Sequence, residues 1–453
     1  AVNSNDISLP DTAALTLVVG LGVTGLSCVR YLASQGGRLA VIDSRDNPPG
    51  LRQLRDEFPD VEFLAGGFSA AAFAAAQRLV VSPGVSLKEP LIEQARSRGA
   101  EVIGDIELFV RGARAPIVAI TGSNGKSTVT TLLGEMALAA GVRAAVGGNL
   151  GTPALELLDE SVELYVLELS SFQLERVRSL RAKAAVVLNL SVDHMDRYDT
   201  YAEYIQAKAV IYRHAETAVV NADDAVAREL AHSPKMIGFS LHRPRADDYG
   251  ICESSGVSWL CRGEQLLLRT DAMPAAGRHN QANALAALAL GEAVGLPLNA
   301  MLSAIGSFEG LAHRTEYVAE FGGVRWFNDS KGTNVGACIA ALEGLDRGDQ
   351  SRTVLIAGGD CKGADFSRLA EIAPCYVRTL VLIGRDAPQI EQAIGGAVPC
   401  VRAVDMGDAV RRAAGHAHEG DRVLLSPACA SFDMFENYLQ RGEIFMAAVR
   451  ELA

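Results

Sequence analysis

The stretch Ile117-Val118-Ala119-Ile120-Thr121-Gly122-Ser123-Asn124-Gly125-Lys126-Ser127-Thr128 decides the fold of the middle of this chain. Its first residues are apolar, as in a fully buried strand, and a helical pattern follows the stretch to about Ala140. A glycine-rich turn between a strand and a helix predicts a loop that binds phosphate. Backbone N–H groups would surround the phosphate oxygens, Lys126 would reach the terminal phosphates, and a hydroxyl of Ser127 or Thr128 would hold Mg²⁺. Ile120 stands where the common form of the motif has its first glycine, so ordinary GTPases match poorly.

Two further apolar stretches downstream of this loop end in metal-binding residue types. Glu168 lies near the end of the predicted strand 164–169, and His194 lies between two aspartates just beyond the predicted strand 184–190. Ligands bind at the carboxyl edge of a parallel sheet, so both side chains are expected at the same edge as the phosphate loop. Mg²⁺ prefers the oxygen ligand of a carboxylate such as Glu168, and histidine is a frequent ligand of metal ions in general.

A second glycine-rich loop, Gly20-Leu21-Gly22-Val23-Thr24-Gly25, lies between the predicted strand 15–19 and the predicted helix 26–34. Asp43 follows 18 residues beyond Gly25, where an acid can accept hydrogen bonds from ribose hydroxyls. A complete dinucleotide fold needs two such halves, yet the next phosphate loop begins about 100 residues later. One half suits one nucleotide, so we expect a nucleotide-linked substrate here and disfavour NAD.

Strand and helix patterns alternate along three blocks, which predicts an α/β protein of three domains. We expect a Rossmann-like domain at residues 1–111, whose glycine loop suits a nucleotide-linked substrate, and a central P-loop ATPase-type α/β domain at residues 112–310. A C-terminal Rossmann-like α/β domain is expected at residues 311–453. The central block changes character at about 236–271, where short alternating segments predict β-hairpins.

The composition of the 453 residues is that of an ordinary globular protein with an acidic surface. There are 54 acidic and 42 basic side chains, which gives a net charge of −12. Such a surface does not favour nucleic acid or anionic lipid, and no apolar run approaches the roughly 20 residues needed to cross a bilayer. Asp6 and Pro10 lie where a secretory signal would need its apolar core. The eight cysteines form no CxxC pair, so we expect reduced thiols, a cytoplasmic protein, no metal cluster and no membrane partner.

Taken together, the motifs resemble those of the Mur ligases of peptidoglycan precursor synthesis, whose ATPase domain is similar to that of folylpolyglutamate synthase. The end of the chain, from Leu425 to Asp433, looks like the branch of the family that adds D-glutamate. The remaining segments that carry the resemblance are the GxGxxG opening, residues 121–127, 147–151, 168–173, 193–198 and 329–334.

The resemblance implies an ATP-dependent ligase for cell wall biogenesis, in which UDP-N-acetylmuramoyl-L-alanine and D-glutamate are the substrates. ATP would phosphorylate the carboxylate of the UDP-linked substrate, and the amine of D-glutamate would attack the acyl phosphate. The family acts with Mg²⁺, here expected as two ions, and the chain is expected to act as a monomer. Lys208 reads by its spacing as an ordinary solvated lysine, but the family carbamylates the matching lysine, which turns a cation into a carboxylate-like metal ligand.

Residue roles follow from the resemblance, position by position. Tyr438 departs from the family, which often has phenylalanine there, so its contact is left open. The UDP-linked substrate is expected at Val23, Thr24, Asp43, Ser44, Arg45, Gly84, Asn149 and His194, and D-glutamate at Thr333, Lys362, Ser431 and Phe432. ATP is expected at Gly122, Ser123, Asn124, Gly125, Lys126, Ser127, Thr128, Asn280, Asn283, Arg314 and Asp329. The metal ligands are expected to be Ser127 and Glu168 for one ion and His194 and Lys208 for the other, and the catalytic residues Lys126, Glu168, His194 and Lys208.

Three alternatives remain open on the sequence alone. The chain could be a folylpolyglutamate-type or another amino-acid-adding ligase, although the UDP-type opening and the C-terminal signature argue against this. It could be a Rossmann oxidoreductase with NAD on the first loop, which leaves the loop at residues 122–128 unexplained. It could also be a nucleotide-dependent switch without ligase chemistry.

Overall fold

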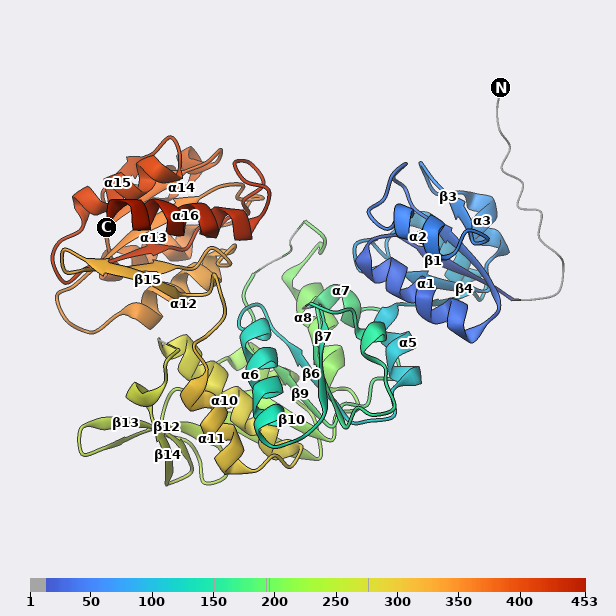
Figure 1. The fold of residues 1–453 in the computed structure, drawn as a ribbon, viewed down its shortest axis with the longest axis horizontal. Coiled ribbons are helices and arrows are strands. Elements are labelled where there is room, and N and C mark those ends of the chain that lie inside the picture. The colour runs from blue at the N-terminus through green and yellow to red at the C-terminus, as the bar shows by residue number, and fades with distance from the viewer. Residues whose placement is uncertain (1–13, 150, 193, 195, 276) are drawn as a thin grey trace.

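The structure is a computed structural model that describes residues 14–149, 151–192, 194, 196–275 and 277–453. Three β-sheets follow one another along the chain, each covered by helices, which confirms the predicted three-domain α/β architecture. In Figure 1 the central part of the chain lies between the N-terminal part, drawn in blue, and the C-terminal part, drawn in orange and red. No helix within the described residues is long and apolar enough to cross a membrane.

The N-terminal sheet has five strands in the order β3-β2-β1-β4-β5, and every pairing is parallel. Apolar strands such as Leu15–Val19 are buried because helices cover both faces of the sheet, as parallel strands require. Gly36, at a φ of 75°, ends the first helix. The elements are β1 (Leu15–Val19), α1 (Val23–Gln35), β2 (Arg38–Ile42), α2 (Leu51–Glu57), β3 (Glu62–Leu64), α3 (Ala70–Ala75), β4 (Arg78–Val81), α4 (Pro90–Ser97), β5 (Glu101–Ile103) and α5 (Asp105–Gly112).

The central sheet has nine strands in the order β14-β13-β12-β11-β10-β9-β6-β8-β7. Its strands are β6 (Ile117–Thr121), β7 (Ala144–Gly148), β8 (Leu164–Glu168), β9 (Ala184–Val187), β10 (Thr217–Asn221), β11 (Lys235–Phe239), β12 (Tyr249–Ser254), β13 (Val257–Arg262) and β14 (Gln265–Arg269). Its helices are α6 (Lys126–Ala139), η1 (Ala154–Leu157), α7 (Ser171–Leu174), α8 (Tyr201–Ala209), η2 (Val210–Tyr212), α9 (Ala225–Leu230), η3 (Thr270–Ala272), α10 (Arg278–Ala293) and α11 (Leu298–Ser307).

Two features of the central sheet refine the prediction. β11 pairs in parallel with β10, so the predicted hairpin region contributes one strand to the parallel part before β12–β14 form an antiparallel meander. The apolar helices α10 and α11 pack against α6 on one face, which is why α6 is buried over much of its length. The phosphate loop is thereby fixed between a buried strand and a buried helix.

The C-terminal sheet has the order β15-β16-β20-β17-β18-β19, parallel except for the β15–β16 hairpin. β15 was not predicted, because its half-exposed residues lack the apolar run that marks the inner strands. The elements are β15 (Glu316–Phe321), β16 (Val324–Asn328), α12 (Val335–Leu345), β17 (Thr353–Gly358), α13 (Ser367–Tyr376), β18 (Val377–Ile383), α14 (Ala387–Ile394), β19 (Cys400–Arg402), α15 (Met406–His416), β20 (Arg422–Leu425) and α16 (Tyr438–Leu452).

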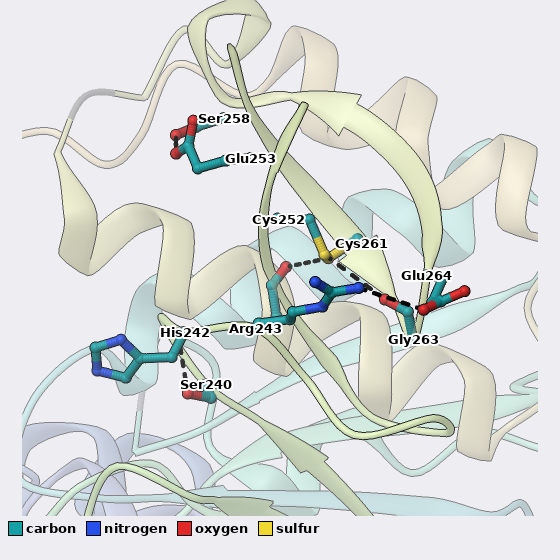
Figure 2. Close-up of a disulfide and its surroundings, with 10 residues drawn as sticks. Ser240, His242, Arg243, Cys252, Glu253, Ser258, Cys261, Gly263 and Glu264 are labelled. Atoms are coloured by element: carbon teal, nitrogen blue, oxygen red, sulfur yellow. Dashed lines mark hydrogen bonds and ion pairs between the residues drawn. A yellow bond between two sulfur atoms is a disulfide. The ribbon is translucent and has the colours of Figure 1, made fainter. Parts of the chain in front are cut away.

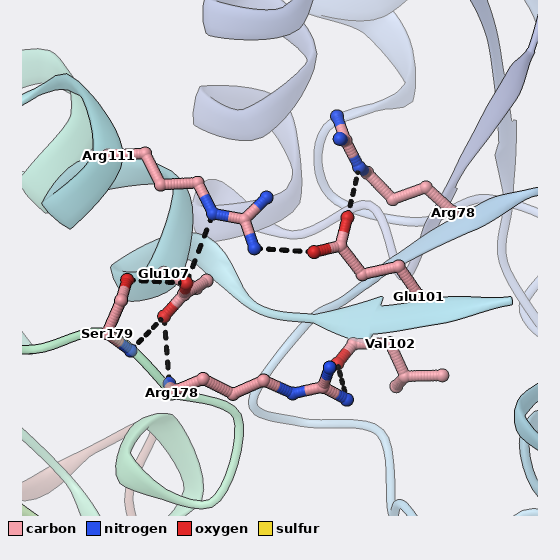
Figure 3. A network of polar contacts seen from close by, with 7 residues as sticks. All are labelled: Arg78, Glu101, Val102, Glu107, Arg111, Arg178 and Ser179. Carbon is pink, nitrogen blue, oxygen red and sulfur yellow. Dashed lines mark hydrogen bonds and ion pairs between the residues drawn. The ribbon is translucent and has the colours of Figure 1, made fainter.

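A polar network joins the N-terminal and central sheets (Figure 3). Glu107 of α5 is buried and accepts hydrogen bonds from the backbone N–H groups of Arg178 and Ser179, at 2.8 and 3.0 Å. Arg111, one turn further along α5, contacts both Glu107 and Glu101 of β5. Hydrogen bonds from Arg111 and Arg78 lower the pKa of Glu101 to about 2. α5 therefore connects the N-terminal sheet to the loop before β9 of the central part, as do the ion pairs of Lys88 with Asp199 and Glu203 elsewhere between the two parts.

The prediction of reduced cysteines is wrong for one pair. Cys252 on β12 and Cys261 on β13 form a disulfide in the antiparallel meander (Figure 2). A sequence separation of nine residues matches no redox or metal motif, and only the register of the hairpin brings the two sulfurs together. The other six cysteines are free thiols, and Cys375 is exposed among them.

Candidate active site

The loop between β6 and α6 has the backbone of a phosphate-binding loop. Gly122 and Gly125 have φ angles of 151° and 84°, which only glycine adopts readily. A Cβ on Gly125 would lie 2.5 Å from Oδ1 of Asn283, so α10 closes over the loop without space for a side chain. Lys126 is the first residue of α6, and its Nζ donates to the carbonyl of Gly122 over 2.8 Å. The ammonium group therefore lies over its own loop, at the helix N-terminus that favours anions.

Ser127 and Glu168 form a buried pair beside this loop. Ser127 Oγ donates to Oε2 of Glu168 over 2.7 Å, and Nδ2 of Asn149 donates to Oε1 over 3.2 Å. Glu168 is the last residue of β8 and pairs in register with Ile120 of β6, so the strand end delivers the carboxylate to the loop. One hydroxyl and one carboxylate are oxygen donors of the type that Mg²⁺ binds, so these residues fit that metal.

No group of three histidine, cysteine, aspartate or glutamate side chains with metal-binding geometry occurs within the described part of the chain.

Lys208 is buried, so its reading as an ordinary solvated lysine is wrong. Its Nζ lies 3.0 Å from the carbonyl of Gly122 and 3.2 Å from Oγ1 of Thr121, at the base of the phosphate loop. The ring of Tyr204, one turn earlier on α8, lies 4.9 Å from Nζ. The structure therefore places Lys208 at the loop, as the family resemblance implies.

His194 lies near the same tyrosine. Its ring centroid is 5.0 Å from that of Phe172 and 6.4 Å from that of Tyr204, and its φ of 55° is left-handed. Both predicted ligands of the second ion therefore lie close to the ring of Tyr204. Asp193, from the same motif, lies outside the described residues.

A cavity of about 310 Å³ extends from the phosphate loop to the C-terminal domain. Asn124, Gly125 and Thr128 line it from the loop, Asn280 and Asn283 from α10, and Arg314, Asp329 and Lys331 from the C-terminal domain. Seven residues predicted to bind ATP therefore share one cavity, although they are spread over about 200 residues of sequence. Gly122, Ser123, Lys126 and Ser127 lie in the same loop but do not line this cavity.

Among the described residues, Asp329 is one of three acidic residues that line this cavity, together with Asp224 and Glu343. Its Oδ2 accepts from Ser426 Oγ over 2.7 Å, and its Oδ1 accepts from the N–H of Thr315 over 3.1 Å. Burial raises the pKa of Asp329 to about 6, although the Ser426 hydrogen bond and the charge of Arg314 oppose this shift. Asp329 is thus ionised at neutral pH and available to a hydroxyl donor.

Asp43, which was expected to accept hydrogen bonds from ribose hydroxyls, already accepts hydrogen bonds from protein groups. Asp43 is buried, and its carboxylate accepts from the N–H of Leu21 at 2.7 Å and from the N–H and side chain of Arg45 at 2.8–2.9 Å. Burial raises the pKa of Asp43, but these hydrogen bonds outweigh that effect and lower it below its ordinary value. Val23, Thr24, Ser44 and Gly84 lie on exposed or half-buried loops and helix starts nearby, and Asn149 lies in the central domain beside Glu168.

The residues predicted to bind D-glutamate lie at the carboxyl edge of the C-terminal sheet. Lys362 Nζ lies 5.9 Å from the ring centroid of Phe432, which is 67% exposed. Ser431 is buried next to it, and an isolated bridge between Asp360 and Ala430 holds the two loops together. Thr333 lies in the third loop of this edge, between β16 and α12. Neither these residues nor those around Asp43 line the cavity shared by the phosphate loop and Asp329.

His279, Thr315 and Lys331 are among the cavity residues that were not assigned a role from the sequence. His279 precedes Asn280, which is predicted to bind ATP, and burial lowers the pKa of His279 to about 4, so its ring is neutral. Thr315 Oγ1 lies 3.2 Å from Nε2 of His279, and Lys331 Nζ lies 4.0 Å from the ring centroid of Tyr438. Each lies within two positions of a residue predicted to bind ATP, and this closeness in sequence was the only sign that they would line the cavity.

Known proteins are similar to this chain over nearly its whole length. Three family models match: "Mur ligase MurD-like, N-terminal domain" at residues 14–104, "Mur ligase middle domain" at 120–291, and "Mur ligase, glutamate ligase domain" at 313–429. UDP-N-acetylmuramoylalanine–D-glutamate ligase of Nitrosococcus oceani is 54% identical over 451 residues, which cover 99% of both chains. The protein of the same name from Pseudomonas aeruginosa is 55% identical over 438 residues, covering 96% of this chain and 98% of that protein.

Solved structures agree on the fold. MurF from Acinetobacter baumannii has a TM-score of 0.60 at 18% identity, covering 96% of this chain and 90% of that one. UDP-N-acetylmuramate-alanine ligase from Thermotoga maritima has a TM-score of 0.59 at 16% identity, covering 98% and 100%. Given the three family models and the near-complete relatives, this chain belongs to the Mur ligase family.

Proposed function

We propose that this protein is an ATP-dependent ligase that joins D-glutamate to UDP-N-acetylmuramoyl-L-alanine in peptidoglycan precursor synthesis. The substrate names are those of relatives more than 50% identical over nearly the whole chain. The observation that carries the proposal is the cavity in which the phosphate loop faces Arg314, Asp329 and Lys331 of the C-terminal domain. A nucleotide triphosphate in this cavity would be held by two domains at once, as a reaction with three substrates requires.

The cavity offers complementary groups to each part of ATP. Asn280 and Asn283 present amides, which can pair with the donor and acceptor edge of adenine. Asp329 is an acceptor for ribose hydroxyls, while Lys126, Arg314 and Lys331 supply positive charge for the phosphates. Burial lowers the pKa of Arg314, but an arginine remains charged at neutral pH.

The carboxylate of the UDP-linked substrate must be activated before an amine can attack it. ATP supplies a phosphate for the acyl phosphate, and the amine of D-glutamate then displaces that phosphate to form the amide. Protein groups contribute mainly by positioning the reactants and by opposing charge on the transferred phosphate. Lys126 is placed for the second task because its ammonium lies at the loop over Gly122.

Mg²⁺ would neutralise phosphate charge and polarise the phosphoryl group when bound. We propose Ser127 and Glu168 as ligands of one ion and His194 with carbamylated Lys208 as ligands of a second. The first pair is supported by its hydrogen bond of 2.7 Å. The members of the second pair both lie near Tyr204, whose ring centroid is 6.4 Å from that of His194 and 4.9 Å from Nζ of Lys208. A neutral or anionic group at Lys208 Nζ is needed there, because an ammonium would repel the metal.

The first domain is proposed to bind the UDP moiety, with Arg45 and the N-terminus of α1 facing its phosphates. The third domain is proposed to bind D-glutamate, with Lys362 opposite a carboxylate. We propose domain limits near residues 111 and 311, a monomer, and a cytoplasmic location where ATP is available.

The test is release of ADP in the presence of UDP-N-acetylmuramoyl-L-alanine and each glutamate enantiomer. We expect ADP release with D-glutamate and little with L-glutamate or with either substrate omitted. ADP release that needs no amino acid would instead support a nucleotide switch. An increase of NADH fluorescence on titration with the protein would favour the oxidoreductase alternative.

A further inference from the structure

Arg441 is a buried cation that the proposed chemistry does not use. Its side chain has no exposed surface, and it occupies the fourth position of α16. No carboxylate among the described residues forms an ion pair with it, whereas buried charges are normally paired. A cation in the first turn of a helix is also disfavoured by the helix dipole. Burial lowers the pKa of Arg441 to about 10, so it still carries its charge at neutral pH.

The guanidinium group donates to two loops at the carboxyl edge of the C-terminal sheet. Nη2 donates to the carbonyl of Ser330 over 2.7 Å, and Nε donates to Oγ of the same serine over 3.0 Å. Nη1 donates to the carbonyl of Cys429 over 3.0 Å. Ser330 Oγ in turn donates to the carbonyl of Tyr438 over 2.7 Å, which connects the first loop to the start of α16.

The two loops carry groups proposed to bind different substrates. Ser330 lies between Asp329, proposed for the ribose of ATP, and Lys331, which lines the same cavity. Cys429 lies two residues before Ser431, proposed for D-glutamate. Neither loop is regular, so its shape depends on such hydrogen bonds; Ala428, for example, has a φ of 58°. A planar fork of donors suits this connection because one rigid group fixes three acceptors at once.

Arg422 provides an internal comparison. It is equally buried, at the first residue of β20, and contacts Thr353 and Ser351 at 3.0 Å and Asp346 at 3.5 Å. Those contacts lie at the amino end of β20, whereas the two substrate loops follow the carboxyl ends of β16, at Asp329, and of β20, at Ser426. Arg422 has a carboxylate partner and touches neither loop, so burial of an arginine in this domain does not by itself create the connection made by Arg441.

We propose that Arg441 is a positioning residue. It holds the loop after β16, which carries Asp329 and Thr333, and the loop after β20, which carries Ser431, in one arrangement. The inference rests on the proposed function and deepens it, because it makes the binding of two substrates depend on one side chain that touches neither of them.

The test compares Arg441→Met and Arg441→Lys with Arg422→Met as the matched control. We expect Arg441→Met to raise the KM for D-glutamate and the KM for ATP by about tenfold each, with the KM for the UDP-linked substrate within about twofold of wild type. Arg441→Lys should raise the same two KM values less, because an ammonium can still donate to some of the three oxygens that Arg441 contacts. Arg422→Met should lower the melting temperature and leave all three KM values within about twofold.

Equal KM values in Arg441→Met and Arg422→Met would overturn the proposal, since Arg441 would then serve stability alone. If Arg441→Met does not fold, Arg441→Lys and Ser330→Ala decide the question. Both should raise the two KM values, and the double variant should show less than the sum of the two effects, because the residues share hydrogen bonds. Wild-type values in both single variants would refute it.

A failure of the proposed function would be visible separately, as wild-type protein that releases no ADP with D-glutamate. Binding of a fluorescent ATP analogue to the same variants would then test the connection by itself. Arg441→Lys should bind the analogue more weakly than Arg422→Met does. Equal binding by these two variants would overturn the inference.

Discussion

Ser127 Oγ and Glu168 Oε2 are 2.7 Å apart in the buried interior of the central domain, although the two residues are 41 positions apart in sequence. The pair joins the first turn of α6 to the end of β8, where a phosphate loop and a strand-end carboxylate can share a cation.

Glu168→Gln is expected to raise the Mg²⁺ concentration needed for half-maximal ADP release by about tenfold or more, because an amide keeps the shape but loses the charge. The control is Glu163→Gln, just before the same strand, where the side chain is exposed and accepts a hydrogen bond from the N–H of Arg143. Initial rates against Mg²⁺ concentration measure both variants. An unchanged Mg²⁺ requirement in Glu168→Gln would remove this residue from the metal site.

Lys126→Ala is expected to reduce turnover by at least ~100-fold, since phosphate charge at the loop would be left without its cation. The melting temperature should stay near that of wild type, because the side chain donates to the carbonyl of Gly122 in its own loop and the loss of one loop cation alters stability little. Lys183→Ala is the control, since Lys183 forms an exposed ion pair with Glu216. Near-normal turnover of Lys126→Ala would contradict the assignment of the loop.

Lys208 is expected to act as a carbamate, which replaces a charge of +1 by −1 beside the proposed metal. Lys208→Ala should lose most activity, and small carboxylates such as formate should restore part of it by occupying the vacated space. Wild-type protein labelled with ¹³CO₂ should show a carbamate resonance that the variant lacks. Absence of that resonance from active, labelled wild-type protein would rule out the modification.

Asp329 predicts a pH dependence of stability. Its folded-state pKa of about 6 lies above the unfolded value near 3.9, so the folded state binds a proton more tightly between these pH values. The stabilisation by the protonated carboxyl is therefore complete below about pH 4 and is lost as pH rises through about 6, by on the order of 3 kcal/mol.

Asp329→Asn does not titrate and serves as the reference for that measurement. The unfolding free energy of wild type minus that of Asp329→Asn should fall as pH rises from 4 to 6.5, because only the wild type loses stability when Asp329 ionises. Urea unfolding followed by tryptophan fluorescence reports it, because Trp326 is fully buried in the adjoining strand β16. A constant difference over this range would show that the carboxyl group titrates normally.

Much of the site could be predicted because its parts are local. The β6–α6 loop is specified by apolar residues, glycines and a lysine within twelve consecutive positions, and the position of Glu168 follows from the rule that parallel strands end at one edge. The same logic predicted the inner strands of all three sheets. It missed β15, since half-exposed edge strands have no comparable pattern.

Other parts of the site could not be predicted from spacing. Lys208 looks like any helix lysine until α8 packs beside the loop, and the Cys252–Cys261 bond depends on the register of a hairpin. Likewise, the contact between Ser426 and Asp329 joins residues 97 positions apart.

The sequence by itself determined the strands and helices around the two glycine loops, the succession of three α/β parts, and the residue types of those loops. The reason is that near-neighbour sterics and the period of apolar residues act within a few positions of the chain. Only the tertiary structure decided that Lys208 is buried at the phosphate loop, that Asp329 faces that loop across one cavity, and that Arg441 lies beneath two loops. Those relations depend on how helices and sheets pack against each other, and packing is a property of surfaces assembled from distant segments.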